Sequence, residues 1–163
     1  MSESSDIVQY LDKQYPSSPR VITPGTLAFE TAYYRYFQAE VRAKWPLCVY
    51  QYLYETVSPE SQTWIRESRD PPTGDVTMDP QSQWDAFKDA LGSVSLPVYE
   101  KAEGIFLKGS EPAWADFVTA AAVLCNKMTY GADSKEWKAI ETWHGGRWAK
   151  LIKDLEPYCH IDE

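Results

Sequence analysis

The sequence predicts an all-α fold, a helical bundle around an aromatic-rich core. Apolar residues recur at intervals of three and four through most of the chain, which is the spacing of one helical face. No stretch shows the sustained two-residue alternation, bounded by turn pairs, that predicts strands. Aromatic residues make up 14% of the 163 residues, and each buried ring removes about 150–250 Å² from water. The length is that of one domain.

The first helix is short and is followed by a linker. Ile7, Tyr10 and Leu11 share one helical face, and Pro16 ends the helix. Residues 17–23 are expected to form the linker. Thr23-Pro24 predicts the start of a second helix, because a hydroxyl residue often caps a helix whose first residue is Pro.

An aromatic stripe follows on the second helix: Phe29, Tyr33, Tyr36 and Phe37 are spaced by three and four, and Tyr34 extends the stripe. Two interpretations are open. The stripe is either part of the core, which is the favoured interpretation, or the wall of an apolar ligand pocket with phenolic hydroxyls.

The remaining helices follow from start signals and apolar faces. Ser58-Pro59 and Asp79-Pro80 predict two helix starts, separated by an exposed loop over residues 69–78. Residues 111–128 are the most apolar helical segment and should form the central buried helix. Pro46 is expected to divide the second helix, and the apolar face beyond it contains Leu47, Tyr50, Leu53 and Tyr54.

The charge and the reactive residues exclude several classes of function. Net charge is −8, with 24 acidic residues and 16 scattered basic ones, which argues against nucleic acid and anionic membranes as partners. The cysteines, Cys48, Cys125 and Cys159, are widely spaced, and no zinc spacing or nucleotide-binding loop occurs, so no metal site is expected. Free thiols and the absence of a signal-peptide pattern or a long apolar run predict a cytoplasmic protein.

The segment Trp143–Trp148 contains two glycines between aromatic residues. One interpretation is a ligand corner in which His144 and Arg147 contact an anion. The favoured interpretation is a corner between two helices, where Gly145 and Gly146 turn the chain and Arg147 stacks on a ring or pairs with an acid.

Four stretches carry a family resemblance. Residues 3–12 (ESSDIVQYLD) and 106–117 (FLKGSEPAWADF) resemble segments of glutathione S-transferases, in the same order and with suitable spacing. The segments 133–137 and 143–148 are similar to the fungal ustiloxin-cluster (UstS-like) branch. The resemblance covers nearly the whole chain and implies an all-α bundle similar to the C-terminal domain of these transferases.

The resemblance also implies a domain division and a missing part. Residues 1–19 correspond to the last helix and linker of a truncated thioredoxin-like domain, and residues 20–163 to the C-terminal helical domain. Intact relatives use glutathione as co-substrate to act on small hydrophobic electrophiles. Their catalytic residue lies in the part of the thioredoxin-like domain that has no counterpart here, so no catalytic residue is assigned. The chain alone is expected to be inactive.

Site residues follow from the same resemblance. Glu3 and Ser4 match the pair that binds the γ-glutamyl end of glutathione. Ser4 and Ser5 are also suitable helix caps, and with the rest of the site missing this is the favoured interpretation. Tyr33, Tyr34 and Phe37 are the implied wall of the hydrophobic-substrate site. Asp116 matches the residue that caps the central helix. The hydroxyl partner of this cap is replaced by Ala113, a loss that typically costs about 1 kcal/mol.

A different class of function remains open, a non-catalytic module that binds a protein or a hydrophobic ligand. The surface that contacts the thioredoxin-like domain in the family should expose apolar side chains here. The expected partners are therefore a second copy of the chain, another protein or a small hydrophobic ligand.

Overall fold

The computed structural model describes residues 4–45, 49, 52, 54–68 and 78–159. The all-α prediction is confirmed: the described elements are helices, and the only β-type pairing among them is an isolated bridge between Phe106 and Gly109. Several residues for which the sequence makes predictions lie outside these ranges, namely Glu3, Pro46, Leu47, Cys48, Tyr50, Leu53 and most of the 69–78 loop.

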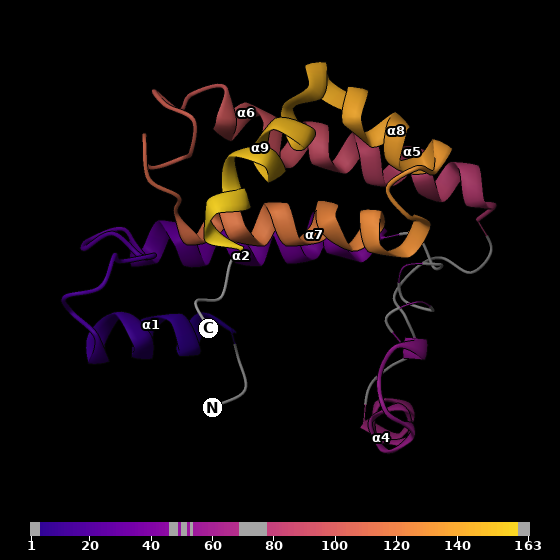
Figure 1. Ribbon diagram of the computed structural model, residues 1–163, viewed down its shortest axis with the longest axis horizontal. Helices are drawn as coiled ribbons and strands as arrows, with labels where there is room; N and C mark the ends of the chain where they lie inside the picture. The colour runs from indigo at the N-terminus through magenta and orange to yellow at the C-terminus, as the bar shows by residue number, and fades with distance from the viewer. Residues whose placement is uncertain (1–3, 46–48, 50–51, 53, 69–77, 160–163) are drawn as a thin grey trace.

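The helices follow one another along the chain in the order shown in Figure 1. The α-helices are α1 (Ser4–Gln14), α2 (Leu27–Glu40), α4 (Pro59–Ser68), α5 (Pro80–Ala90), α6 (Leu96–Tyr99), α7 (Trp114–Tyr130), α8 (Lys135–Thr142) and α9 (Arg147–Leu155). Shorter turns are η1 (Arg42–Lys44), the π-helical η2 (Leu91–Ser95), η3 (Trp143–Gly146) and η4 (Glu156–Tyr158).

Helix α7 is the centre of the bundle, as its composition predicts. Figure 1 shows α7 running alongside α2, and α8 and α9 also pack on it. Its side chains Ala120, Ala122 and Val123 are buried in the core cluster. A helix with so little polar surface is stable only where other elements cover it on several sides.

Helix α9 shows the amphipathic pattern of an outer helix. Trp148, Leu151 and Leu155 lie on one face and are buried, while Lys150 and Asp154 form an ion pair on the outside. Burying one large apolar side chain contributes about 1.5–3 kcal/mol. The buried face of α9 therefore fixes the C-terminal part of the chain on α7.

The predicted start of the second helix is wrong by three residues. Thr23-Pro24 forms a turn in which Thr26 N donates to Thr23 O at 3.0 Å, and α2 begins only at Leu27. Gly25 has φ +88°, which is incompatible with a right-handed helix, so the helix cannot begin before it. The start at Asp79-Pro80 is confirmed, because the Asp79 carboxylate accepts from Gln81 N and Ser82 N.

Helix α1 has no buried residue, unlike the helices α2, α5, α7, α8 and α9 that form the bundle. Figure 1 shows it at the edge of the molecule, apart from the central helices. Ile7, Tyr10 and Leu11 form the predicted apolar face, and all three are exposed. The apolar face of α1 is therefore available to another surface.

Candidate functional site

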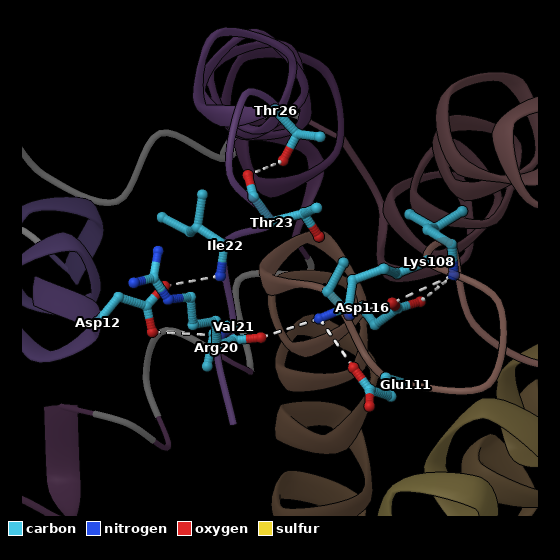
Figure 2. Close-up of polar contacts among 11 residues, drawn as sticks. Asp12, Arg20, Val21, Ile22, Thr23, Thr26, Lys108, Glu111 and Asp116 are labelled. Atoms are coloured by element: carbon cyan, nitrogen blue, oxygen red, sulfur yellow. Dashed lines mark hydrogen bonds and ion pairs between the residues drawn. The ribbon is translucent and has the colours of Figure 1, made fainter. Parts of the chain in front are cut away.

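Helix α1, which carries Ser4, is connected to the central bundle through the linker. The linker in turn contacts the loop that precedes α7. Asp12, near the end of α1, accepts two backbone hydrogen bonds: from Val21 N at 3.2 Å and from Ile22 N at 2.9 Å (Figure 2). Hydrogen bonds to a carboxylate are stronger than bonds between neutral groups. Asp12 thus ties α1 to the linker although α1 buries no side chain.

Lys108 joins the linker to the loop that precedes α7. Its Nζ donates to the carbonyl oxygen of Arg20 at 2.9 Å and lies 3.3 Å from Glu111 Oε2 (Figure 2). The Lys108 side chain is mostly covered, whereas the Glu111 side chain is largely exposed. The bond to Arg20 is therefore the better shielded of the two contacts and holds the linker against this loop.

Asp116 lies fully buried in the first turn of α7. Its Oδ2 accepts from Ala113 N at 2.8 Å and from Leu107 N at 3.2 Å. Burial raises the pKa of the Asp116 carboxyl, and the hydrogen bond from Ala113 opposes that rise. The carboxylate closes the loop 107–113 over the N-terminus of the helix.

A second carboxylate at the same helix end comes from α2. Glu30 Oε2 accepts from Ala115 N at 3.1 Å, and burial raises the pKa of Glu30. Sequence reasoning missed this residue. The signal was present, because Glu30 precedes Tyr33 and Phe37 by three and seven residues and therefore lies on the same helical face.

The three residues expected to form a hydrophobic wall point into the bundle. The Tyr33 hydroxyl donates to Ser95 Oγ at 3.0 Å, and Phe37 is only 2% exposed. Tyr34 is half-buried, with its ring centroid 4.7 Å from that of Trp114. Burial raises the pKa of Tyr33, so its hydroxyl stays protonated. Of the three, Phe37 has almost no surface with which to contact a ligand.

The interpretation of the whole aromatic stripe as core is wrong for two of its members. Phe29 is 77% exposed and Tyr36 is 54% exposed. At about 100° per residue, Phe29 and Tyr36 lie about 40° and 60° from Tyr33, on the side away from Glu30, so they flank the inward face of the helix and are not covered by it. Helix α2 thus has aromatic side chains on both faces.

His144 and Arg147 are each engaged within the chain. Trp148 Nε1 donates to His144 Nδ1 at 2.7 Å, and burial, with a smaller effect from Lys88, lowers the pKa of His144. Arg147 Nη2 donates to Ile105 O at 2.9 Å, and its guanidinium carbon lies 4.4 Å from the Tyr99 ring centroid. These are contacts expected of a helix corner, and a ligand role for the two residues stays a prediction.

The backbone conformation of this corner explains why Gly145 and Gly146 occur there. His144, Gly145 and Gly146 have φ of 49°, 70° and 79°, all in the left-handed region. Glycine adopts such values without strain, which is why the pair can reverse the chain between α8 and α9.

Ser4 is the first residue of α1 and is exposed, as a ligand contact requires. The described part of the chain holds no group of three or more side chains suited to bind a metal ion. Within the same ranges, each helix is too short or too polar to cross a lipid bilayer. Cys125 and Cys159 are free thiols.

Several solved structures resemble this fold. Two glutathione S-transferases of Ceriporiopsis subvermispora, both in complex with glutathione, are 27% and 25% identical, with TM-scores of 0.81 and 0.77. The matches cover 99% and 96% of this chain but 68% and 66% of those chains, so it spans about two thirds of their length. The transferase GSTFuA2 of Phanerochaete chrysosporium shares the fold at 23% identity and a TM-score of 0.80, over 99% of this chain and 67% of its own.

Sequence comparison gives the family. No curated protein sequence matches the chain significantly. A family model described as "Glutathione S-transferase, C-terminal domain" matches residues 28–158, which is most of the chain and runs from the second residue of α2 to the end of η4. The chain therefore belongs to the family of glutathione S-transferase C-terminal domains.

Proposed function

We propose that this chain is the helical part of a glutathione S-transferase-like protein that uses glutathione to modify small hydrophobic electrophiles. The observation that carries the proposal is the match, over nearly all of this chain, to transferases solved in complex with glutathione. In this proposal residues 1–19 are the last helix and linker of a thioredoxin-like domain, and residues 20–163 are the C-terminal domain. The protein belongs to the fungal UstS-like branch and works in the cytoplasm.

The reaction needs an activated thiol. The thiolate of glutathione, and not the thiol, attacks an electrophile, so a transferase must lower the pKa of that thiol. We assign this task to the thioredoxin-like domain and to no residue of this chain. Tyr33, a phenol on the helix after the linker, is unsuited to it, because its hydroxyl is bonded to Ser95 and its pKa is raised.

Residues at the start of α1 are the proposed contacts to glutathione. Ser4 presents a hydroxyl at the first residue of the helix, and Glu3 precedes it. Free N–H groups and the helix dipole at such an end favour the carboxylate of a γ-glutamyl group. The bonds of Asp12 to the linker fix α1, and with it this contact, relative to the bundle.

Helix α2 supplies the proposed wall for the hydrophobic substrate. Tyr34 is the member of the predicted set that combines an accessible ring with a packed neighbour, Trp114. Tyr33 and Phe37 pack against each other further inside the bundle, with ring centroids 5.9 Å apart. A pocket of this kind binds through apolar contact with few polar groups, which suits small electrophiles of varied shape.

The assignment of catalysis is tested by turnover. The purified chain is mixed with glutathione and the chromogenic electrophile 1-chloro-2,4-dinitrobenzene, and product formation is followed by absorbance. The expected rate is that of the uncatalysed reaction. A rate that rises with chain concentration and saturates with glutathione would show that residues 1–163 contain a thiol-activating group.

The exposed apolar side chains favour a second candidate function, a non-catalytic interaction module. Ile7, Tyr10 and Leu11 of α1 and Phe29 and Tyr36 of α2 are all exposed. Sedimentation velocity tests this function: a concentration-dependent dimer of the wild type, weakened by Phe29→Ser and Tyr36→Ser, is expected. A monomer at all concentrations that binds no hydrophobic dye would contradict it.

A further inference from the structure

The N-terminus of α7 lacks a normal cap. Its N-cap residue is Ala113, with φ −96° and ψ 166°, the extended geometry of an N-cap, but its side chain has no hydrogen-bond acceptor. Asp116 accepts from Ala113 N and so provides one half of a capping box. The other half, an acceptor for an N–H in the first turn, is normally a Ser, Thr, Asp or Asn side chain at the N-cap.

Glu30 is placed where that acceptor is needed. Ala115 is the second residue of α7, and its N–H is one of the donors that an N-cap side chain usually satisfies. Glu30 Oε2 lies 3.1 Å from this nitrogen, although the two residues are 85 positions apart. Glu30 is 9% exposed and Ala115 is 4% exposed, so little water reaches the pair.

We infer that Glu30 supplies, from α2, the N-cap acceptor that Ala113 lacks, and that this bond fixes α2 against the first turn of α7. The N-terminal end of a helix carries a partial positive charge that favours a carboxylate. The charges that face Glu30 are those of Asp116 and Lys108, one of each sign. A cap within α7 would stabilise only that helix, whereas a cap from α2 also stabilises the packing of two helices.

The inference gives Glu30 a role that depends on the residue at position 113. A hydroxyl at this position would compete for the same helix end and make Glu30 less important. The dependence distinguishes a cap from a buried acid that merely packs between two helices, because only a cap loses its importance when a local cap is restored.

The test is a double-mutant cycle on the full chain, with Glu30→Ala, Ala113→Ser and the double variant unfolded in urea and followed by circular dichroism. Glu30→Ala alone is expected to lower the folding equilibrium constant about tenfold, because a buried N–H loses its acceptor. In the Ala113→Ser background, the loss should fall to about threefold or less, because the new hydroxyl can accept in place of Glu30. Glu40→Ala is the matched control, since Glu40 lies on the same helix and pairs with Lys44 at the surface.

Hydrogen exchange at the Ala115 amide keeps the inference testable if the Ala113→Ser substitution is not accommodated, since Ala113 is itself buried. Glu30→Ala should reduce protection of this amide. Glu30→Gln keeps a side-chain oxygen and should retain protection. An equal loss from Glu30→Ala in both backgrounds, or unchanged protection of Ala115 in Glu30→Ala, would overturn the inference.

Discussion

The hydroxyl oxygen of Tyr33 lies 2.7 Å from Oγ1 of Thr119, so α2 and α7 are joined by a polar contact between residues 86 positions apart. The same hydroxyl bonds to Ser95 Oγ in η2, and Thr119 Oγ1 donates to Ala115 O within α7. Buried polar groups are stable only when they find such partners. This cluster of hydroxyls therefore specifies how three elements meet beside the apolar core.

The first prediction is that removing the Tyr33 hydroxyl lowers the stability of the fold. Tyr33→Phe should lower the free energy of unfolding by about 1 kcal/mol, because two hydroxyls lose a partner while the ring still packs against Phe37. Tyr36→Phe on the same helix is the control, since Tyr36 is exposed and should change stability very little. Urea denaturation checks both variants, and equal effects would contradict the account of the cluster.

The second prediction concerns the close approach of Gly92 to His144. A Cβ added at Gly92 would lie 2.6 Å from His144 Nε2, a ring that Trp148 holds in place. Gly92→Ala should therefore lower stability by about 1–3 kcal/mol. Thermal unfolding measures the effect.

The matched background for this prediction is His144→Gly. It removes the ring, and glycine tolerates the φ of 49° at this position. In this background Gly92→Ala should be neutral or slightly stabilising, because Ala restricts the unfolded chain more than Gly does. The same loss in both backgrounds would show that the clash is not with His144.

The third prediction is a pH dependence. Burial raises the folded-state pKa of Glu30, and nearby Asp116 raises it further, while the Ala115 N–H and Lys108 oppose the rise. The folded chain then holds this proton more tightly than the unfolded chain. The stability that protonation of Glu30 adds to the fold is fully present below pH 4.5, the ordinary pKa of a glutamate. It is lost as the pH rises through the raised pKa of Glu30 in the folded chain.

Glu30→Gln cannot titrate and isolates this effect. As the pH falls from neutral into the acid range, the free energy of unfolding of the wild type should rise relative to that of Glu30→Gln. Urea denaturation of both proteins at a series of pH values gives the difference. Stability curves that stay parallel would contradict the raised pKa.

The fourth prediction is that α1 can be loosened without unfolding the bundle. Asp12→Ala removes the acceptor for Val21 N and Ile22 N, and α1 has no buried residue to hold it otherwise. Amide exchange in α1 should become faster, while the melting temperature of the whole chain changes little. Asp6→Ala, on the same helix, should leave exchange near the linker unchanged. A large loss of global stability in Asp12→Ala would show that α1 is part of the core.

The sequence predicted those parts of the fold that local signals control. Helix α7 is recognisable because its apolar residues leave almost no polar face, and α5 because Asp79 caps it before Pro80. The start of α2 was misplaced, because the Thr23-Pro24 signal did not take account of the positive φ of Gly25. Aromatic residues alone did not reveal which face of α2 is buried, since both faces carry them.

The polar contacts of the candidate site were harder to predict than the helices. Asp116 acts within its own turn and follows from a local pattern. The contacts from Glu30 to Ala115 and from Lys108 to Arg20 join residues 85 and 88 positions apart and depend on how the helices pack. Helical spacing could place Glu30 on the buried face of α2, but only the packed structure identifies its partner.

Calorimetric titration of glutathione into the purified chain is the most direct test of the central claim, that this helical domain serves a glutathione-dependent reaction. We expect weak, saturable binding that Ser4→Ala removes and that Ser5→Ala, the neighbouring substitution in the same helix, leaves in place. A titration without saturable heat would contradict the assignment of glutathione to the start of α1.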